Sequence, residues 1–118
     1  MNFSFDNNLP IYVQLVDELK KYIVSGEIKP GEKLMSVRDL ANVAKVNPNT
    51  MQKALVELEN AGLLYTERTS GRFVTKDISK ITEIKNAYAK KLAQDYIFNM
   101  QKIGISKDEA LKYLKGDK

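Results

Sequence analysis

The sequence contains no cysteine and no histidine in its 118 residues. The lack of cysteine excludes disulfides, thiolate metal sites and cysteine nucleophiles, and the lack of histidine removes the commonest general base and zinc ligand. The carboxylates are scattered among helical patterns and form no catalytic group. We therefore expect a protein that is not an enzyme and that needs no metal or other cofactor.

Long apolar runs are also missing, and the chain does not start with a basic segment followed by an apolar one. No stretch approaches the roughly 20 apolar residues that cross a bilayer. The length suits one compact domain with an appendage. The sequence thus predicts a cytoplasmic protein without a membrane partner.

The first two thirds of the chain carry no net charge. The net charge is +4, but residues 1–78 hold ten basic and ten acidic side chains, so the surplus lies in residues 79–118. Global charge therefore cannot support a nucleic-acid hypothesis. A local excess does occur in residues 33–53, with four basic side chains and one acidic one.

Helical periodicity marks three segments in the first half of the chain. The first is predicted to begin with Pro10 in its first turn and to end near Ser25. Ser36 is the expected N-cap of a short second helix. Asn47 and Pro48 repeat the start signal, a cap followed by proline, and predict a third helix.

The pattern becomes β-prone after the third predicted helix. Residues 63–66 and 72–75 are rich in aliphatic, aromatic and threonine side chains, and the glycine-containing residues 69–71 separate them. We expect a hairpin here, so the fold class is mostly α with a small β-hairpin. The order helix, short helix, helix, hairpin matches a winged helix-turn-helix.

A long amphipathic pattern fills residues 79–103, and Ser106 begins a last short helix. A helix of this length, roughly 36 Å, cannot hide a broad apolar stripe on so small a domain. We expect the stripe to pair two copies of the chain. Its members are Ile81, Ile84, Tyr88, Leu92, Tyr96 and Met100.

Two alternatives for this tail stay open: packing on its own domain, and adsorption to a membrane surface. The second is disfavoured because the polar face lacks a dense basic cluster. The aromatic and methionine side chains along the seam also leave a small apolar effector as a hypothesis. Together these patterns predict an N-terminal arm at residues 1–9, a winged helix-turn-helix domain at 10–77 and a helical dimerisation tail at 78–118.

Polar side chains gather at the start of the third predicted helix. Asn49 and Gln52 carry amides, which form paired hydrogen bonds with adenine, and Thr50 suits a phosphate or a thymine methyl group. Arg38 on the second helix is placed to reach a phosphate. The alternative reading is that these residues are the solvated face of an amphipathic helix.

The sequence resembles the GntR family of bacterial transcription regulators through several ordered blocks. They are residues 10–15 (PIYVQL), 26–34 (GEIKPGEKL), 36–41 (SVRDLA), 54–63 (ALVELENAGL) and 71–74 (GRFV). The resemblance implies a third helix in the major groove, a second helix against the backbone and a wing beside the minor groove. Family contact positions correspond to Ser36, Arg38, Asn47, Asn49, Thr50, Gln52, Ser70 and Gly71, and charge and placement add Lys53 and Arg72.

Two positions depart from the family pattern. Met35 stands in place of a usual proline, which should alter only a turn. Pro48 stands in place of a usual arginine that touches DNA, so some affinity must come from other residues. The short two-helix tail resembles the YtrA subfamily, which implies dimerisation and control of genes that often encode export transporters.

We therefore expect a homodimeric regulator that binds double-stranded DNA. A two-fold dimer reads an inverted repeat with half-sites about one helical turn apart, and repression by promoter occlusion is the expected mode. The alternative function is a protein-interaction module that uses the winged helix without binding DNA. That alternative predicts no salt-sensitive affinity for DNA.

Overall fold

The structure is a computed structural model and describes residues 1–116. Contacts divide the chain into two compact units, Met1–Glu83 and a second that begins at Ile84. The unit boundary falls inside a helix, whereas the predicted domain boundary lies at the start of that helix. The elements are α1 (Ile11–Val24), α2 (Val37–Ala44), α3 (Pro48–Asn60), β1 (Leu64–Glu67), β2 (Gly71–Val74), α4 (Ile78–Lys102) and α5 (Lys107–Leu114).

Side-chain caps begin α2 and α3 as predicted. Ser36 Oγ accepts a hydrogen bond from Asp39 N at 3.1 Å, and Asn47 Oδ1 accepts one from Asn49 N at 2.7 Å. The prediction for Pro10 was wrong by one position. With ψ at 125° this residue is extended and precedes α1 as its N-cap, so the helix begins one residue later.

The turn between α2 and α3 depends on Lys45. Its φ of 57° and ψ of 46° place it in the left-handed region, which reverses the chain directly after α2. Among residues 1–116 it is the one non-glycine residue with positive φ. The turn brings α3 against α2, and both helices then pack around a shared core.

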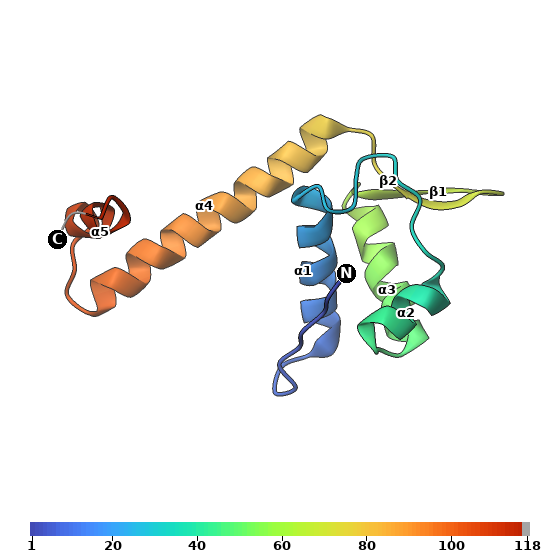
Figure 1. Ribbon diagram of the computed structural model, residues 1–118, viewed down its shortest axis with the longest axis horizontal. Helices are drawn as coiled ribbons and strands as arrows, with labels where there is room; N and C mark the ends of the chain where they lie inside the picture. The colour runs from blue at the N-terminus through green and yellow to red at the C-terminus, as the bar shows by residue number, and fades with distance from the viewer. Residues whose placement is uncertain (117–118) are drawn as a thin grey trace. The chain divides into compact units, whose positions relative to one another are not determined.

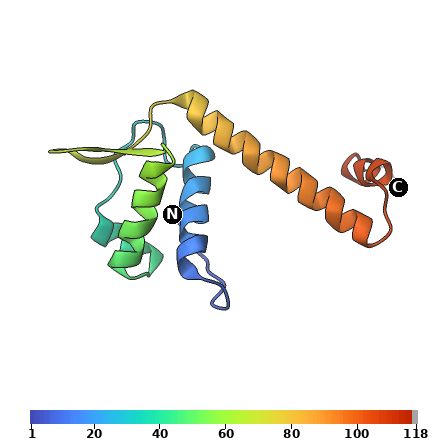
Figure 2. The same cartoon turned by 180° about the vertical axis from the view of Figure 1, so that it is seen from behind.

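The core of the first unit is formed by residues from its helices and its hairpin. Figures 1 and 2 show α1 and α3 side by side from both directions, with the hairpin following the end of α3. Apolar residues at helical spacing face inward because their burial removes apolar surface from water. The largest fully buried side chains are Leu15, Ile23, Leu40, Met51, Leu55, Leu58, Leu63 and Val74.

The predicted hairpin is confirmed, with a shifted tip. β1 and β2 pair antiparallel from Leu64 with Val74 to Glu67 with Gly71, so Gly71 belongs to a strand and residues 68–70 form the turn. β2 also pairs with the segment that precedes α2, which the sequence pattern did not predict. Lys33 forms an isolated antiparallel bridge with Phe73. Lys33 follows directly after residues 29–32, whose proline and glycine predicted only a turn.

The N-terminal arm is covered by α1. Phe3 lies 5.4 Å from Tyr22 and 6.0 Å from Phe5, measured between ring centroids. The Gln14 side chain hydrogen bonds with both the N–H and the carbonyl of Asp6, at 2.7 and 2.9 Å. The arm therefore belongs to the first unit.

The second unit contains most of α4 and all of α5. Tyr96 Oη donates a hydrogen bond to the Ala110 carbonyl at 2.6 Å, and Ala110 is fully buried. Ser106 caps α5 by accepting from Glu109 N at 3.2 Å. No helix among residues 1–116 has the length and apolar character that crossing a membrane requires.

Candidate nucleic-acid interface

The first turns of α3 are open on the surface of the first unit. Asn47, Asn49, Gln52 and Lys53 are exposed, and Thr50 is half-buried. The buried Met51, Ala54 and Leu55 alternate with them and hold the opposite face of the helix in the core. The packing of α3 therefore turns the predicted contact residues outward, where they are accessible to a DNA groove.

Two of the predicted contact residues also cap helices. The Ser36 hydroxyl and the Asn47 side-chain oxygen each accept a backbone N–H, which satisfies a donor that the helix start would leave unpaired. The cap occupies one lone pair of the Asn47 oxygen and fixes the orientation of its amide. Asn49 and Gln52 are exposed amides without that capping duty, so they are the stronger candidates for reading bases.

Arg38 and Lys53 are exposed on α2 and α3 respectively. Exposed cations of this kind suit phosphates, which set the position of a protein on the duplex without reading its sequence. Pro48 is exposed in the first turn of α3 and has no N–H to offer. α3 begins regularly with Pro48 at its first position, although relatives usually have arginine there.

At the wing, Ser70 and Gly71 are exposed, and Ser70 N donates to the Glu67 carbonyl at 3.2 Å to close the turn. Gly71 has a φ of +111°, and a Cβ added there would lie 3.2 Å from Lys33 Cε. The positive φ favours glycine here, whereas the flexible end of the Lys33 side chain could move to admit a Cβ. Lys33 joins the cations of the wing, a placement that depends on the bridge to Phe73.

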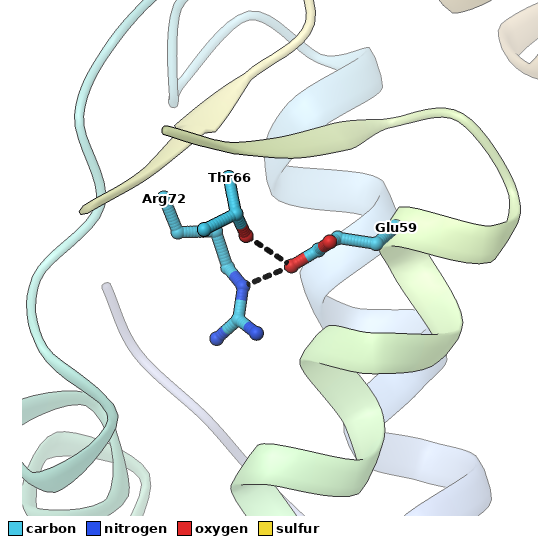
Figure 3. A network of polar contacts seen from close by, with 3 residues as sticks. All are labelled: Glu59, Thr66 and Arg72. Atoms are coloured by element: carbon cyan, nitrogen blue, oxygen red, sulfur yellow. Dashed lines mark hydrogen bonds and ion pairs between the residues drawn. The ribbon is translucent and has the colours of Figure 1, made fainter. Parts of the chain in front are cut away.

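Arg72 is engaged within the protein. Its Nε donates to Glu59 Oε1 at 2.5 Å, and Thr66 Oγ1 donates to the same oxygen at 2.6 Å (Figure 3). The Arg72 side chain is only 17% exposed. A contact between Arg72 and DNA stays a prediction, and the structure adds a contact to α3 that sequence reasoning missed.

Glu59 is the functional candidate that the sequence did not reveal. Burial raises the pKa of its carboxyl, but the hydrogen bonds from Thr66 and Arg72 and the charge of Arg72 outweigh burial and leave that pKa below its ordinary value. Glu59 is therefore ionised at neutral pH. In the sequence, Glu59 and its partner Arg72 are 13 residues apart. Neither the helical nor the strand period relates residues at that distance, so the sequence pattern does not indicate this pair.

A second polar contact links α3 to α1. Tyr12 Oη donates to Glu57 Oε2 at 2.9 Å, and this hydrogen bond raises the pKa of the Tyr12 hydroxyl. Tyr12 and Glu57 also line a shallow groove together with Gln52 and Lys53. This contact joins α3 to α1, whereas Glu59 binds the wing strands.

The residues predicted for dimerisation divide between the two units. Ile81 is only 8% exposed and belongs to the first unit, so no surface role in pairing is supported for it. Leu92 is 66% exposed, while Ile84, Tyr88, Tyr96 and Met100 are half-buried. Dimerisation and an effector at its seam stay predictions.

Within residues 1–116 no cluster of three acidic side chains offers a metal site.

These features define the chain as a winged helix-turn-helix protein, with an exposed polar start to the recognition helix α3 beside a two-stranded wing. Residues 11–74 match the model of the gntR family of bacterial regulatory proteins. The chain belongs to the GntR family, and it is a DNA-binding transcription regulator rather than an enzyme.

The similar proteins include two that match most of this chain and one DNA-binding domain solved with its operator. The transcriptional repressor YtrA of Bacillus subtilis is 32% identical over 92% of this chain and 85% of its own length. A GntR family regulator from Listeria monocytogenes has a TM-score of 0.88 and 39% identity, covering 97% of this chain and 100% of that one. The AraR DNA-binding domain in complex with operator ORX1 has a TM-score of 0.53 and 30% identity, covering 64% of this chain and 92% of that one.

Proposed function

We propose that the chain acts as a homodimer that binds an inverted-repeat operator and represses transcription. The observation that carries the proposal is the exposed polar first turn of α3, supported by apolar side chains that the second unit leaves exposed on α4 and α5. A dimer places two such helices in successive major grooves. Family membership favours this function over a protein-interaction module that ignores DNA.

The proposed contacts are divided between bases and backbone. Asn49 and Gln52 read base edges, while Arg38 and Lys53 bind phosphates. Ser36, Asn47, Thr50, Ser70, Gly71 and Arg72 complete the proposed surface. Support comes from the exposure of most of these side chains on α2, α3 and the wing of one unit.

The regulated genes and the mode of action rest on similarity. The B. subtilis relative is named a repressor, which supports repression by this chain. We further propose that the repressed genes form an operon such as one that encodes a transporter, because the short helical tail resembles that of the YtrA subfamily. A regulator of this family works on the bacterial chromosome, so we place it in the cytoplasm.

Selection of bound duplexes from a random DNA pool tests the proposal. The recovered motif should be an inverted repeat with half-sites about one helical turn, 10–10.5 base pairs, apart. Sedimentation of the complex should then give two chains for each duplex. An asymmetric motif bound by one chain would contradict the dimeric model, and recovery of no motif with no salt-sensitive binding would favour the protein-interaction module.

A further inference from the structure

The wing is joined to the recognition helix at one carboxylate oxygen. Glu59, in the last turn of α3, accepts at Oε1 from Thr66 at 2.6 Å and from Arg72 at 2.5 Å (Figure 3). Thr66 and Arg72 face each other across the two strands as a register pair. Both strands therefore meet the helix at the same atom.

This pair lies next to the tip of the wing. The only pair beyond it is Glu67 with Gly71, and the turn residues 68–70 follow. Backbone bonds attach β2 separately along its length, since the N–H of Gly31 donates to Val74 O at the base and that of Leu34 to Arg72 O nearer the tip, both at 2.9 Å. Those bonds hold β2 to the preceding segment and do not reach α3.

Partial burial favours a well-defined geometry for the contact between Glu59 and Arg72. The side chains of Glu59 and Arg72 are 28% and 17% exposed, so solvent screens the pair less than an open surface ion pair. Binding through Nε also leaves the two terminal nitrogens of Arg72 pointing away from the strands (Figure 3). A guanidinium held in this way retains donors that suit a phosphate.

We propose that Glu59 is a positioning residue that sets the orientation of the wing on the recognition helix. DNA affinity then depends on Glu59 although its carboxylate touches no nucleotide. The inference rests on the proposed function, in which α3 and the wing bind the same duplex. It makes a prediction opposite in sign to simple electrostatics, because removal of an acidic charge by itself favours binding to a polyanion.

The test compares two glutamines on one helix in the full chain. Glu59→Gln removes the charge that binds the wing, whereas Glu57→Gln removes the same charge two residues away, where the carboxylate binds Tyr12 instead. The probe is a fluorescein-labelled duplex selected from a random pool. We expect Glu59→Gln to bind about three- to tenfold more weakly than the parent, as loss of a charge-assisted hydrogen bond implies, and Glu57→Gln to bind equally or more tightly.

A spectroscopic signature accompanies the affinity measurement. In NMR spectra, the Nε–H proton of Arg72 should exchange slowly with water in the parent and in Glu57→Gln, and rapidly in Glu59→Gln. The backbone amide signals of all three proteins should remain those of a folded protein. Thr66→Val removes one of the two hydrogen bonds without changing charge. It should weaken DNA binding in the same direction by a smaller factor, which keeps the test decisive if Glu59→Gln folds poorly.

The proposal is overturned if Glu59→Gln binds the duplex as tightly as the parent or more tightly, or if Glu57→Gln weakens binding to the same extent. It is also overturned if Thr66→Val has no effect on affinity. Failure of the proposed function would look different, because the parent protein itself would then show no salt-sensitive binding to any selected duplex.

Discussion

At the scale of single residues, the polar side chains around α2 and α3 have separate duties. Ser36 and Asn47 satisfy backbone donors at helix starts, and such caps stabilise a helix by about 1 kcal/mol. Asn49 and Gln52 are exposed and carry no cap. Substitution of the first pair would therefore confound stability with DNA binding, and substitution of the second pair would test recognition more directly.

Base and phosphate contacts should respond differently to alanine substitution. We expect Asn49→Ala to cost on the order of 1–3 kcal/mol at particular base pairs, and Arg38→Ala to weaken binding to all sequences and lower the salt slope by about one. Gel-shift titrations on the selected duplex and on base-substituted duplexes, at several salt concentrations, check both effects. If both variants bind like the parent, the docking of α2 and α3 on DNA is wrong.

Lys45 offers a test of backbone strain in the helix-turn-helix. Its left-handed conformation costs free energy for any residue that has a Cβ. Lys45→Gly should therefore raise the free energy of unfolding by about 0.5–1 kcal/mol, measured by urea denaturation. Lys45→Ala is the matched control, since it removes the charge and keeps the Cβ, and it should give no such gain.

At the scale of elements, the hairpin is stabilised by contacts between its own strands and by contacts with the rest of the first unit. The strands pair with each other, β2 pairs with Lys33, and Glu59 of α3 binds both strands. Stacking of Tyr65 on Phe73, with ring centroids 5.5 Å apart, adds an apolar contact. A two-stranded hairpin alone is marginal in water, so these contacts explain its order.

The Glu59 contact should make stability depend on pH in acid. Because the folded pKa of Glu59 lies below that of the unfolded chain, its contribution is complete above the unfolded value, about 4.3, and is lost as the pH falls through the folded value. Glu59→Gln should destabilise by about 1 kcal/mol near pH 6, a modest amount because the pair is partly exposed.

Urea denaturation of the parent and of Glu59→Gln from pH 6 to pH 3 checks this dependence. The difference between the two proteins should narrow below about pH 4.3, where the parent loses the ionised carboxylate. Arg72→Gln breaks the same contact from the other side, so its difference from the parent should narrow in the same range. A difference that stays constant to pH 3 would show that ionised Glu59 does not stabilise the wing.

At the scale of the whole molecule, the second unit leaves several large apolar side chains exposed. Leu92, Ile103 and Leu114 are 66%, 71% and 66% exposed. Large exposed apolar patches mark interaction surfaces. The first unit has its own core, so pairing through the tail would link two DNA-binding units without disturbing either.

Dimerisation should be lost when a charge is placed on this surface. Leu92→Glu should give a monomer by analytical ultracentrifugation, because an unpaired carboxylate is costly to bury in an apolar interface. Loss of the second half-site contact should lower the apparent affinity for the inverted repeat by about 10²–10⁴.

The matched control is Asn86→Glu, which adds the same charge at another exposed position of α4. It should stay dimeric and bind DNA like the parent. A Leu92→Glu protein that remains a dimer, or a monomer with unchanged affinity for the full repeat, would contradict pairing through this surface.

The sequence by itself determined the local structure and the class of the protein. Caps at Ser36 and Asn47, helical apolar periods and the β-prone runs predicted five helices and a hairpin, because these signals act between residues close in the chain. The same signals indicated which face of α3 meets solvent, since its apolar positions had to face a core.

Only the tertiary structure decided the contacts between distant segments. The meeting of Glu59 with Thr66 and Arg72, the bridge from Lys33 to Phe73 and the burial of Ile81 join residues that no periodic pattern relates. The physical reason is that a hydrogen bond between separate elements depends on where the core places them. The sequence thus predicted the recognition helix, and the packing of the first unit decided how the wing is held against it.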